Sequence, residues 1–428
     1  MRPNSQPRSA VRRLALARLI SITGGAAAFA ALNFTVYERT GSAAWLSASL
    51  LLTFGVSGVF APLGGMLGDR FDRKRVMIAS DLAGAACFLA LAFVHEPALL
   101  LALGFVAAVV EAPFWSASAA AVPNLVGKED LAWANGLLQV GGNAGIMLGP
   151  ALGGVLLAAI GPGMVFGLNA FSFVLSAAII ATVRGRFAED RTEHDDEHRG
   201  FRAGFVFIAR DRVLRTIVLA WVALVFGIGL AMVADVPLAE LFGSGSTGYG
   251  LMIGAFGAGS VLGSLAGRKL HERNEARALI LGTIVMGATT AGIALSPWFP
   301  PILALLVLCG AADAVIMIAD RSIQQRRTPD AVRSRVVGAS EAMIDIALSI
   351  GFVLGGPAVA GVGPRAVYAI GGACGLLGAV VLVPVLRASR RASAAAAASE
   401  TAAAGETETE DVQEHVEADE RVAARVAG

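Results

Sequence analysis

Apolar stretches recur along the whole chain, and short polar, glycine-rich or proline-rich turns separate them. Runs of about 18 or more apolar residues with few charges are typical of helices that cross a bilayer. Because a helix satisfies its own backbone hydrogen bonds, very short turns between such helices are possible in lipid. The pattern predicts an all-α membrane protein with twelve transmembrane helices, at approximately 14–37, 44–68, 76–94, 98–122, 133–160, 163–183, 214–240, 247–267, 278–296, 300–322, 335–360 and 364–386.

The basic residues fall on one side of this predicted topology. Of the 34 Lys and Arg residues, all except Arg18, Arg39 and Arg365 lie in the two termini, in alternate loops or at the adjoining ends of the spans. Cytoplasmic loops carry such an excess of Lys and Arg, so we expect both termini in the cytoplasm. The predicted organisation is a cytoplasmic N-terminal segment (1–13), a six-helix bundle (14–183), a cytoplasmic linker (184–213), a second six-helix bundle (214–386) and an Ala- and Glu-rich tail expected to be disordered or partly helical (387–428).

The composition excludes a soluble protein. The chain has 428 residues, is 56% hydrophobic and 16% charged, and its mean hydropathy is +0.68, whereas soluble domains carry about 25% charged residues. Cys87, Cys309 and Cys374 fall inside predicted spans, and the histidines lie in loops and the tail without metal-ligand spacing. The sequence has no phosphate-binding Gly-x-x-x-x-Gly-Lys-Ser/Thr loop. We therefore expect a protein that is not an enzyme, with no cofactor, no metal and no nucleic-acid partner.

Features of the first predicted bundle recur in the second. Pro150 in span five, within a glycine-rich tract, corresponds to Pro357 in span eleven, and Glu111 in span four corresponds to Asp313 in span ten. Such similar spacings indicate two six-helix repeats. In secondary transporters, repeats of this kind flank a binding site near the middle of the membrane and move against each other.

A tight, charged turn separates predicted spans two and three. Its notable residues are Gly65, Leu67, Asp69, Arg70, Arg73 and Lys74. The turn resembles the signature loop of the major facilitator superfamily, Gly-x-Leu-x-Asp-Arg-x-Gly-Arg-Lys, with Asp72 in place of the second glycine. The resemblance implies a conformational latch in which Asp69 accepts hydrogen bonds at the amino end of span eleven, near Ser334 and Arg335, where a carboxylate is favoured. Alternatively, these charges only hold the loop at the membrane interface.

A second motif lies in span five and consists of Gly149, Pro150, Gly153 and Gly154. It resembles a superfamily element associated with exporters that exchange substrate for protons. Small residues at this spacing let helices approach closely, and proline bends a helix, so helix packing alone is the alternative explanation. The tracts 80–84 and 123–136 also resemble the superfamily branch that contains macrolide and enterobactin exporters.

Two carboxylates lie near the centres of their predicted spans: Glu111 in span four and Asp313 in span ten. A charged group at the centre of a helix costs roughly 2.5–3.5 kcal/mol on insertion scales, so such a residue indicates a functional site. A carboxylate in apolar surroundings binds a proton more readily than one in water. We therefore expect proton coupling or substrate binding here, with a purely structural hydrogen bond as the alternative. Helical spacing adds Phe114, Trp115 and Ser118 to the face of Glu111, and Met317 to the face of Asp313.

The remaining acidic residues within spans have other expected roles. Four of them lie toward the cytoplasmic ends of their spans and close to arginines, so we expect gate or structural ion pairs, with proton carriage as the alternative: Asp81, Asp320, Glu341 and Asp345. Asp235 lies near the outer end of span seven and is a candidate for an outer gate or a proton entry point.

Together, these features predict a secondary active transporter, expected to be a monomer in the bilayer of a bacterial cytoplasmic membrane. It would export small amphipathic molecules, such as drugs, antibiotics or siderophores, in exchange for protons as its two bundles rock about a central cavity. Drug–proton antiporters of the superfamily often carry an arginine in span four, which this chain lacks, so any proton coupling would depend on carboxylates. The alternatives are an importer or uniporter of a metabolite and a non-transporting sensor or scaffold.

Overall fold

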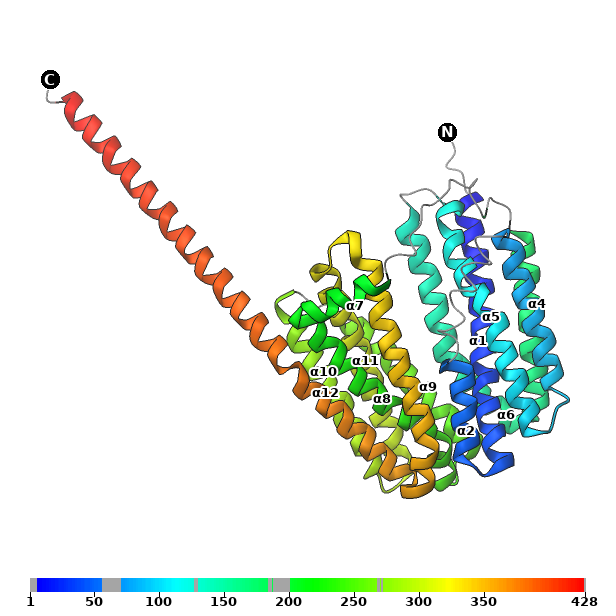
Figure 1. The fold of residues 1–428 in the computed structure, drawn as a ribbon. Helices are drawn as coiled ribbons and strands as arrows, with labels where there is room; N and C mark the ends of the chain where they lie inside the picture. Colours follow the sequence, from blue (N-terminus) through cyan, green and yellow to red (C-terminus); the bar gives the residue numbers. More distant parts are fainter. Residues whose placement is uncertain are drawn as a thin grey trace.

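The computed structural model of the chain is almost entirely helical (Figure 1). It describes residues 6–55, 71–126, 130–183, 187, 201–267, 270 and 272–426. The helices of the first half are α1 (Gln6–Thr40), α2 (Ala43–Leu50), the π-helix η1 (Leu51–Gly55), α4 (Arg73–Leu91), α5 (Pro97–Leu125) and α6 (Leu131–Thr182). Those of the second half are α7 (Phe201–Arg210), α8 (Arg212–Leu241), α9 (Gly245–Gly267), α10 (Glu272–Ala294), α11 (Phe299–Arg327) and α12 (Asp330–Val426).

Two glycines interrupt the longest helices. Gly161 breaks α6 with a φ of 75°, and Gly363 breaks α12 with a φ of 81°. Glycine adopts this left-handed region without steric cost, and a proline follows each break. The breaks fall between the predicted spans 133–160 and 163–183 and between the predicted spans 335–360 and 364–386, so α6 and α12 each consist of two helices.

Eight helical segments among the described residues are long and apolar enough to cross a membrane. Two of these segments contain the breaks at Gly161 and Gly363. The shorter apolar segment Ala43–Gly55 ends where the described part of the first half is interrupted. The helical membrane fold is thus confirmed, while the count of twelve spans and the cytoplasmic location of both termini stay predictions.

Aspartates cap the amino ends of α4 and α8. The Asp72 carboxylate accepts a hydrogen bond from the backbone N–H of Arg75 at 3.0 Å. Asp211 accepts from the backbone N–H groups of Val213 and Leu214 at 2.8 and 2.9 Å. Aspartate is a favoured residue at this position because it satisfies free N–H groups of the first turn. The aspartate that replaces a glycine of the superfamily loop therefore begins α4.

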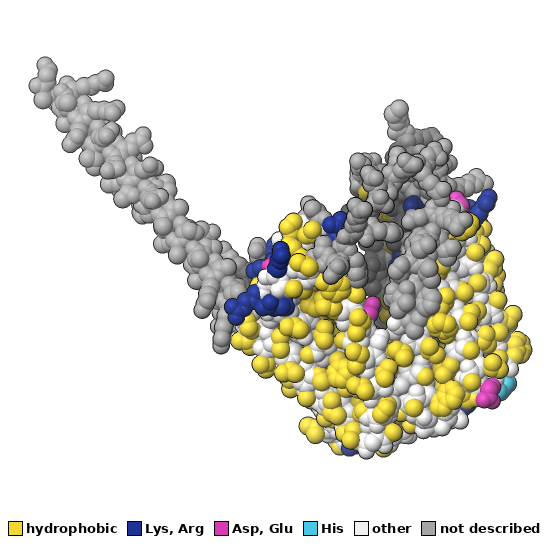
Figure 2. All heavy atoms as spheres, viewed as in Figure 1, with side chains coloured by type: hydrophobic (Ala, Val, Ile, Leu, Met, Phe, Trp, Pro, Cys, Tyr) yellow, Lys and Arg dark blue, Asp and Glu magenta, His cyan; other side chains and the backbone are white. Residues whose placement is uncertain are grey.

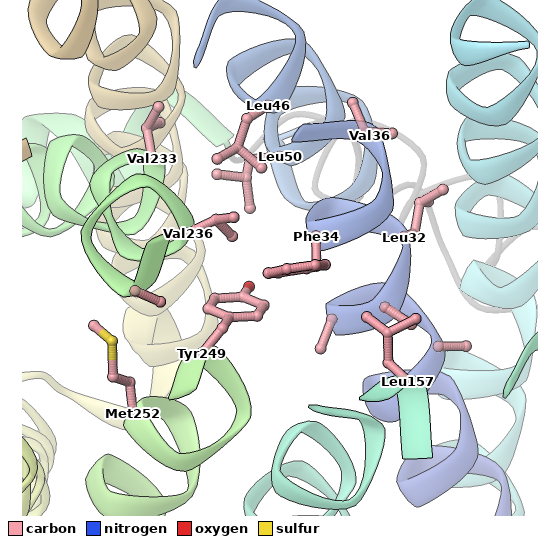
Figure 3. Close-up of a cluster of buried hydrophobic side chains, with 14 of the residues drawn as sticks. Leu32, Phe34, Val36, Leu46, Leu50, Leu157, Val233, Val236, Tyr249 and Met252 are labelled. Atoms are coloured by element: carbon pink, nitrogen blue, oxygen red, sulfur yellow. The ribbon is translucent and has the colours of Figure 1, made fainter. Parts of the chain in front are cut away.

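The two halves meet at one end of the molecule and separate toward the end that carries the N-terminus (Figure 1). At the joined end, which we call the closed end, α1 and α2 share one apolar core with α8, α9 and α12. In Figure 3 the Tyr249 ring of α9 points toward Phe34 of α1, and Val236 of α8 lies beside them. Toward the other end, which we call the open end, each half has its own core.

The outer surface and the connections complete this arrangement. Apolar side chains cover the flanks of both halves (Figure 2), as expected for a surface in contact with lipid. The predicted linker 184–213 includes α7, in which Ile208 packs with Val218 of α8 and Val336 of α12. The backbone of α12 continues as a helix beyond the second bundle to Val426 (Figure 1).

Candidate functional site

Glycines bring the two halves into direct backbone contact at the closed end. A Cβ added at Gly154 of α6 would lie 2.6 Å from the Cα of Gly250 in α9. A Cβ added at Gly356 of α12 would lie 2.9 Å from the Cα of Ala44 in α2. The two contacts join corresponding elements of the two halves, as expected for related repeats. A cavity of about 560 Å³ lies beside the contact between Gly356 and Ala44, and Tyr37 also lines it.

The other members of the span-five motif pack within the first half. A Cβ added at Gly149 would lie 2.6 Å from the backbone oxygen of Thr23 in α1, and Gly153 lies against Ala27 of the same helix. Pro150 lies inside α6 and its carbonyl oxygen approaches Gly250. The motif therefore packs α6 against α1 within one half and, through Gly154, against α9 of the other half.

Hydrogen-bonding side chains also lie between the halves at the closed end. Ser49 of α2 donates a hydrogen bond to the buried Asn33 side chain of α1 at 2.7 Å. Asn33 in turn lies within hydrogen-bonding reach of the buried Tyr249 hydroxyl of α9. In the second half, Tyr368 of α12 donates a hydrogen bond to Asp235 of α8. Asp235 thus lies near the contact between the halves, beside Tyr249.

Glu111 lies inside the first half, among α1, α4 and α6. Its Oε2 is 4.0 Å from the position of a Cβ on Gly25 of α1. Its Oε1 is buried and makes no hydrogen bond to any residue that the structure describes. Asp81 of α4 is only 2% exposed, accepts a hydrogen bond from Ser21 of α1 at 3.3 Å, and interacts electrostatically with Glu111. Asp81 therefore lies in the interior of the first half, and its predicted role in a gate or ion pair stays a prediction.

The residues expected to share a face with Glu111 have different environments. Phe114 and Ser118 are buried, and Phe114 belongs to the core of the first half. Trp115 is 40% exposed, and the guanidinium of Arg18 in α1 lies 4.8 Å from its ring centroid. Phe114 and Ser118 therefore lie inside the helix bundle, while Trp115 lies at its surface, and the predicted cavity role of these residues stays a prediction.

Arg18 is a candidate that sequence reasoning counted but gave no role. Its Nε is buried without a hydrogen-bond partner among the described residues, and Gly142 of α6 leaves space beside it. An arginine on an aromatic face interacts favourably through the ring quadrupole. The signal was present in the sequence, because an isolated basic residue within a span indicates a functional site by default.

Asp313 of α11 belongs to the second half and is half-buried. No hydrogen bond or ion pair joins it to another residue in the described parts of the chain, and it interacts with Cys309 one turn away. The Cys309 thiol lies 3.8 Å from the hydroxyl of Thr290 in α10. Met317, on the same face of α11, is 39% exposed. This second carboxylate is thus separate from the Glu111 and Asp81 pair.

The remaining predicted gate residues lie nearer the open end. Asp320 is buried and accepts two hydrogen bonds from Gln324 of its own helix, at 2.8 and 2.9 Å. Glu341 of α12 forms an exposed ion pair with Arg321 of α11 at 2.9 Å. Asp345 lies one turn further along α12 and is exposed. These contacts lie within the second half, and the predicted gate roles stay predictions.

Two residues of the predicted latch lie within the described part of the chain. Lys74 donates hydrogen bonds at 2.8 Å to the carbonyl oxygens of Ala181 and Val183, at the end of α6. Arg73 donates to the carbonyl of Phe187 at 3.3 Å. Cations are favoured at helix carboxyl ends, where carbonyl groups lack partners. Gly65, Asp69 and Arg70 lie outside the described residues, so the latch itself stays a prediction.

An ion pair joins the beginning of α1 to the residue before α6 at the open end. Arg8 of α1 donates a hydrogen bond to Asp130, just before α6, at 2.8 Å. This hydrogen bond and the charge of Arg8 hold the pKa of the Asp130 carboxyl below its usual value. No group of His, Cys, Asp and Glu side chains suited to a metal ion occurs in the described ranges.

Two helical halves with buried carboxylates and a glycine-lined contact at one end define a membrane transporter of the major facilitator type. The chain belongs to the transmembrane secretion effector family of that superfamily, whose sequence model matches residues 58–410. It is not an enzyme.

Curated relatives support this assignment. The enterobactin exporters EntS of Shigella boydii serotype 18 and of Escherichia coli O139:H28 are both 28% identical over 395 residues. The matches cover 89% of this chain and 93% of each relative. The predicted likeness to the enterobactin-type exporter branch is thereby confirmed.

Solved structures show the same fold. The nucleoside transporter NupG superposes with a TM-score of 0.71 at 14% identity, covering 88% of this chain and 98% of NupG. A bacterial homologue of the iron transporter ferroportin in an inward-facing state superposes with a TM-score of 0.69 at 17% identity, covering 88% and 98%. At these identities the likeness concerns the fold alone.

Proposed function

We propose that the protein is a secondary active exporter that moves small amphipathic molecules out of the cell in exchange for protons. The proposal rests on the arrangement of the protein's apolar cores. One core joins the halves at the closed end, whereas the halves have separate cores at the open end. Two rigid halves joined at only one end can exchange that contact for one at the other end, which is the motion that alternating access requires.

The distribution of basic residues gives the direction of this opening. Lys and Arg residues concentrate at the end that carries the N-terminus, and such residues mark the cytoplasmic side. The open end therefore faces the cytoplasm and the closed end faces outward, with both termini and the tail inside. In this state a substrate enters the space between the halves from the cytoplasm, as an exporter needs.

The buried carboxylates carry protons in this scheme. Glu111 in the first half and Asp313 in the second lie within their bundles without a cation beside them among the described residues. An unpaired carboxylate inside a bundle is favoured in its protonated, neutral form, and it can release the proton when water reaches it. Asp235 and Tyr368, near the contact between the halves, belong to the outer gate.

The substrate is bound by apolar and aromatic side chains between the halves. Trp115 and Met317 are the partly exposed members of the predicted cavity faces, and Arg18 supplies a positive charge beside Trp115. An aromatic, anionic compound fits this pair. The relatives named as enterobactin exporters support a siderophore-like substrate. We place the protein as a monomer in the inner membrane of a bacterium.

Transport into inside-out membrane vesicles tests this proposal. Vesicles containing the protein are given an acid interior, with radiolabelled enterobactin and the dye Hoechst 33342 as probes. We expect uptake of at least one probe that collapses when an ionophore removes the pH gradient. Uptake that does not respond to the gradient would indicate a uniporter, and uptake only in right-side-out vesicles would indicate an importer.

Substitutions of the carboxylates refine this test. Glu111→Gln and Asp313→Asn are expected to reduce gradient-driven uptake, while Glu38→Gln, at an exposed position of α1, serves as the matched control. Full gradient-driven uptake by the double variant would refute proton coupling through these residues.

A further inference from the structure

Asp81 and Glu111 come from different helices and lie together inside the first half. The Ser21 hydroxyl of α1 donates a hydrogen bond to Oδ1 of Asp81 at 3.3 Å. Glu111 faces the same helix one turn further on, at Gly25. The ring of Phe173 in α6 packs against Gly25 and Gly84, at 3.9 and 3.4 Å from the positions of their Cβ atoms. The pair is therefore enclosed by α1, α4 and α6 together with α5, the helix of Glu111.

Several buried polar atoms around this pair make no hydrogen bond within the described part of the chain. Ser176 is fully buried beside Asp81, but its hydroxyl does not reach hydrogen-bond geometry. Leaving such an atom unsatisfied costs about 1–3 kcal/mol, so several polar groups are buried together around the two carboxylates at a cost to stability. The buried atoms without a hydrogen bond to any described residue are Asp81 Oδ2, Glu111 Oε1, Asn169 Nδ2 and Ser176 Oγ.

The charges around the pair do not balance. Among the described residues, no basic side chain acts on either carboxylate. Arg18 of α1 lies one turn from Ser21 but stacks on Trp115 and interacts with neither acid. The other titratable neighbour is the Cys87 thiol of α4. Two negative charges without a cation in a bundle within the membrane repel each other and are poorly solvated.

We infer that Asp81 and Glu111 form a single proton-binding unit, in which the two carboxylates share a proton and exchange it as a pair. When a proton binds, an O–H bond forms on one carboxylate, and the resulting neutral carboxyl group no longer repels the other carboxylate. On release, the proton passes to water on the side to which the bundle is open. This inference rests on the proposed function and extends it, because Asp81 becomes a partner of Glu111 in proton coupling.

Labelling with dicyclohexylcarbodiimide tests the inference without any substrate. This reagent modifies protonated carboxyl groups in apolar surroundings, and mass spectrometry of the purified full-length protein identifies the modified residue. Labelling is measured between pH 5 and pH 9 for the wild type, Asp81→Asn and Glu111→Gln. Glu38→Gln is the matched control, and elution as a single folded species from a sizing column is required of every variant.

Shared protonation predicts that removing either carboxylate changes the labelling of the other. Because the repulsion is gone, the remaining acid stays ionised more readily, and its labelling near neutral pH should fall by about tenfold. Profiles of Asp81 and Glu111 that do not respond to removal of the partner would overturn the inference.

The outcome is separable from that of the proposed function. Coupled labelling without transport of either probe would support the shared proton-binding unit. It would refute the exporter role or the choice of substrates. Proton-driven transport with independent labelling would support the exporter and overturn the shared site. Modification of neither residue at any pH in folded wild-type protein would also overturn it, because a shared proton must be present on one of them.

Discussion

Replacing Gly154 with alanine is expected to open the closed end. The added Cβ would lie 2.6 Å from both the Cα of Gly250 and the carbonyl oxygen of Ser246, whereas ordinary contacts begin at 3.4 Å. These neighbours are backbone atoms, so they cannot rotate away and α6 must move from α9. Overpacking of this kind costs about 1–3 kcal/mol, which corresponds to a shift of roughly 5- to 150-fold in the ratio of closed to open molecules.

The accessibility of a buried interface residue measures this shift. Val236 of α8 is fully buried at the contact between the halves. The reporter is Val236→Cys, in a background in which Cys87, Cys309 and Cys374 are replaced by serine. A membrane-impermeant maleimide is applied to whole cells, and the rate of labelling is recorded. We expect Gly154→Ala to raise this rate at least about fivefold, in line with the lower limit of the overpacking cost.

Two other glycines of α6 provide the controls. Gly167 has nothing within 4 Å of an added Cβ, so Gly167→Ala should leave the labelling rate unchanged. Gly153 packs on Ala27 within the first half, so Gly153→Ala should lower thermal stability without exposing Val236. An unchanged rate in folded Gly154→Ala protein, or an equal increase in Gly153→Ala, would refute the reasoning.

Three further predictions concern single contacts. Tyr368→Phe removes the hydroxyl that donates a hydrogen bond to Asp235. It should destabilise the detergent-solubilised protein by about 1–3 kcal/mol, measured by thermal unfolding. An unchanged thermal midpoint would mean that water replaces the hydroxyl. Arg18→Lys keeps the charge but loses the planar stack on Trp115. It should weaken enterobactin binding about two- to fivefold, measured by equilibrium dialysis. Weakened binding in Arg18→Gln but not in Arg18→Lys would assign the role of Arg18 to its charge alone. Because Arg8 lowers the pKa of Asp130, the pair stabilises the protein above the usual aspartate pKa of about 3.9, and this contribution is lost as the pH falls through the lowered pKa of the folded state. The wild type and Asp130→Asn should therefore differ more in thermal midpoint at pH 7 than at pH 3.

Much of the fold could be predicted because membrane helices leave a local signal. Each apolar run must satisfy its backbone within itself, so length and hydropathy identify the helices without knowledge of their neighbours. The turns at Gly161 and Gly363 were predictable from glycine and proline, and Asp72 has the short side chain of a helix cap. The resemblance of the charged turn and of the span-five glycines to superfamily motifs allowed the superfamily to be predicted.

The candidate site was less predictable, because it depends on the rotation and position of several helices. Spacing along α5 placed Phe114, Trp115 and Ser118 on one face, yet the structure buries Phe114 and Ser118 and exposes Trp115. A face about 100° wide on one helix contacts a different neighbour on each side. Residue spacing therefore cannot tell the bundle interior from a surface that a ligand can reach.

The sequence by itself determined the helical membrane architecture, the distribution of basic residues between the two sides and the membership of the superfamily, because each is encoded in local composition or in contiguous motifs. Only the tertiary structure decided that Asp81 meets Glu111, that Asn33 approaches Tyr249, and that Gly154 closes one end against Gly250. These contacts join residues far apart in the chain. They exist because close packing of several helices, rather than the preference of any one of them, sets which faces meet.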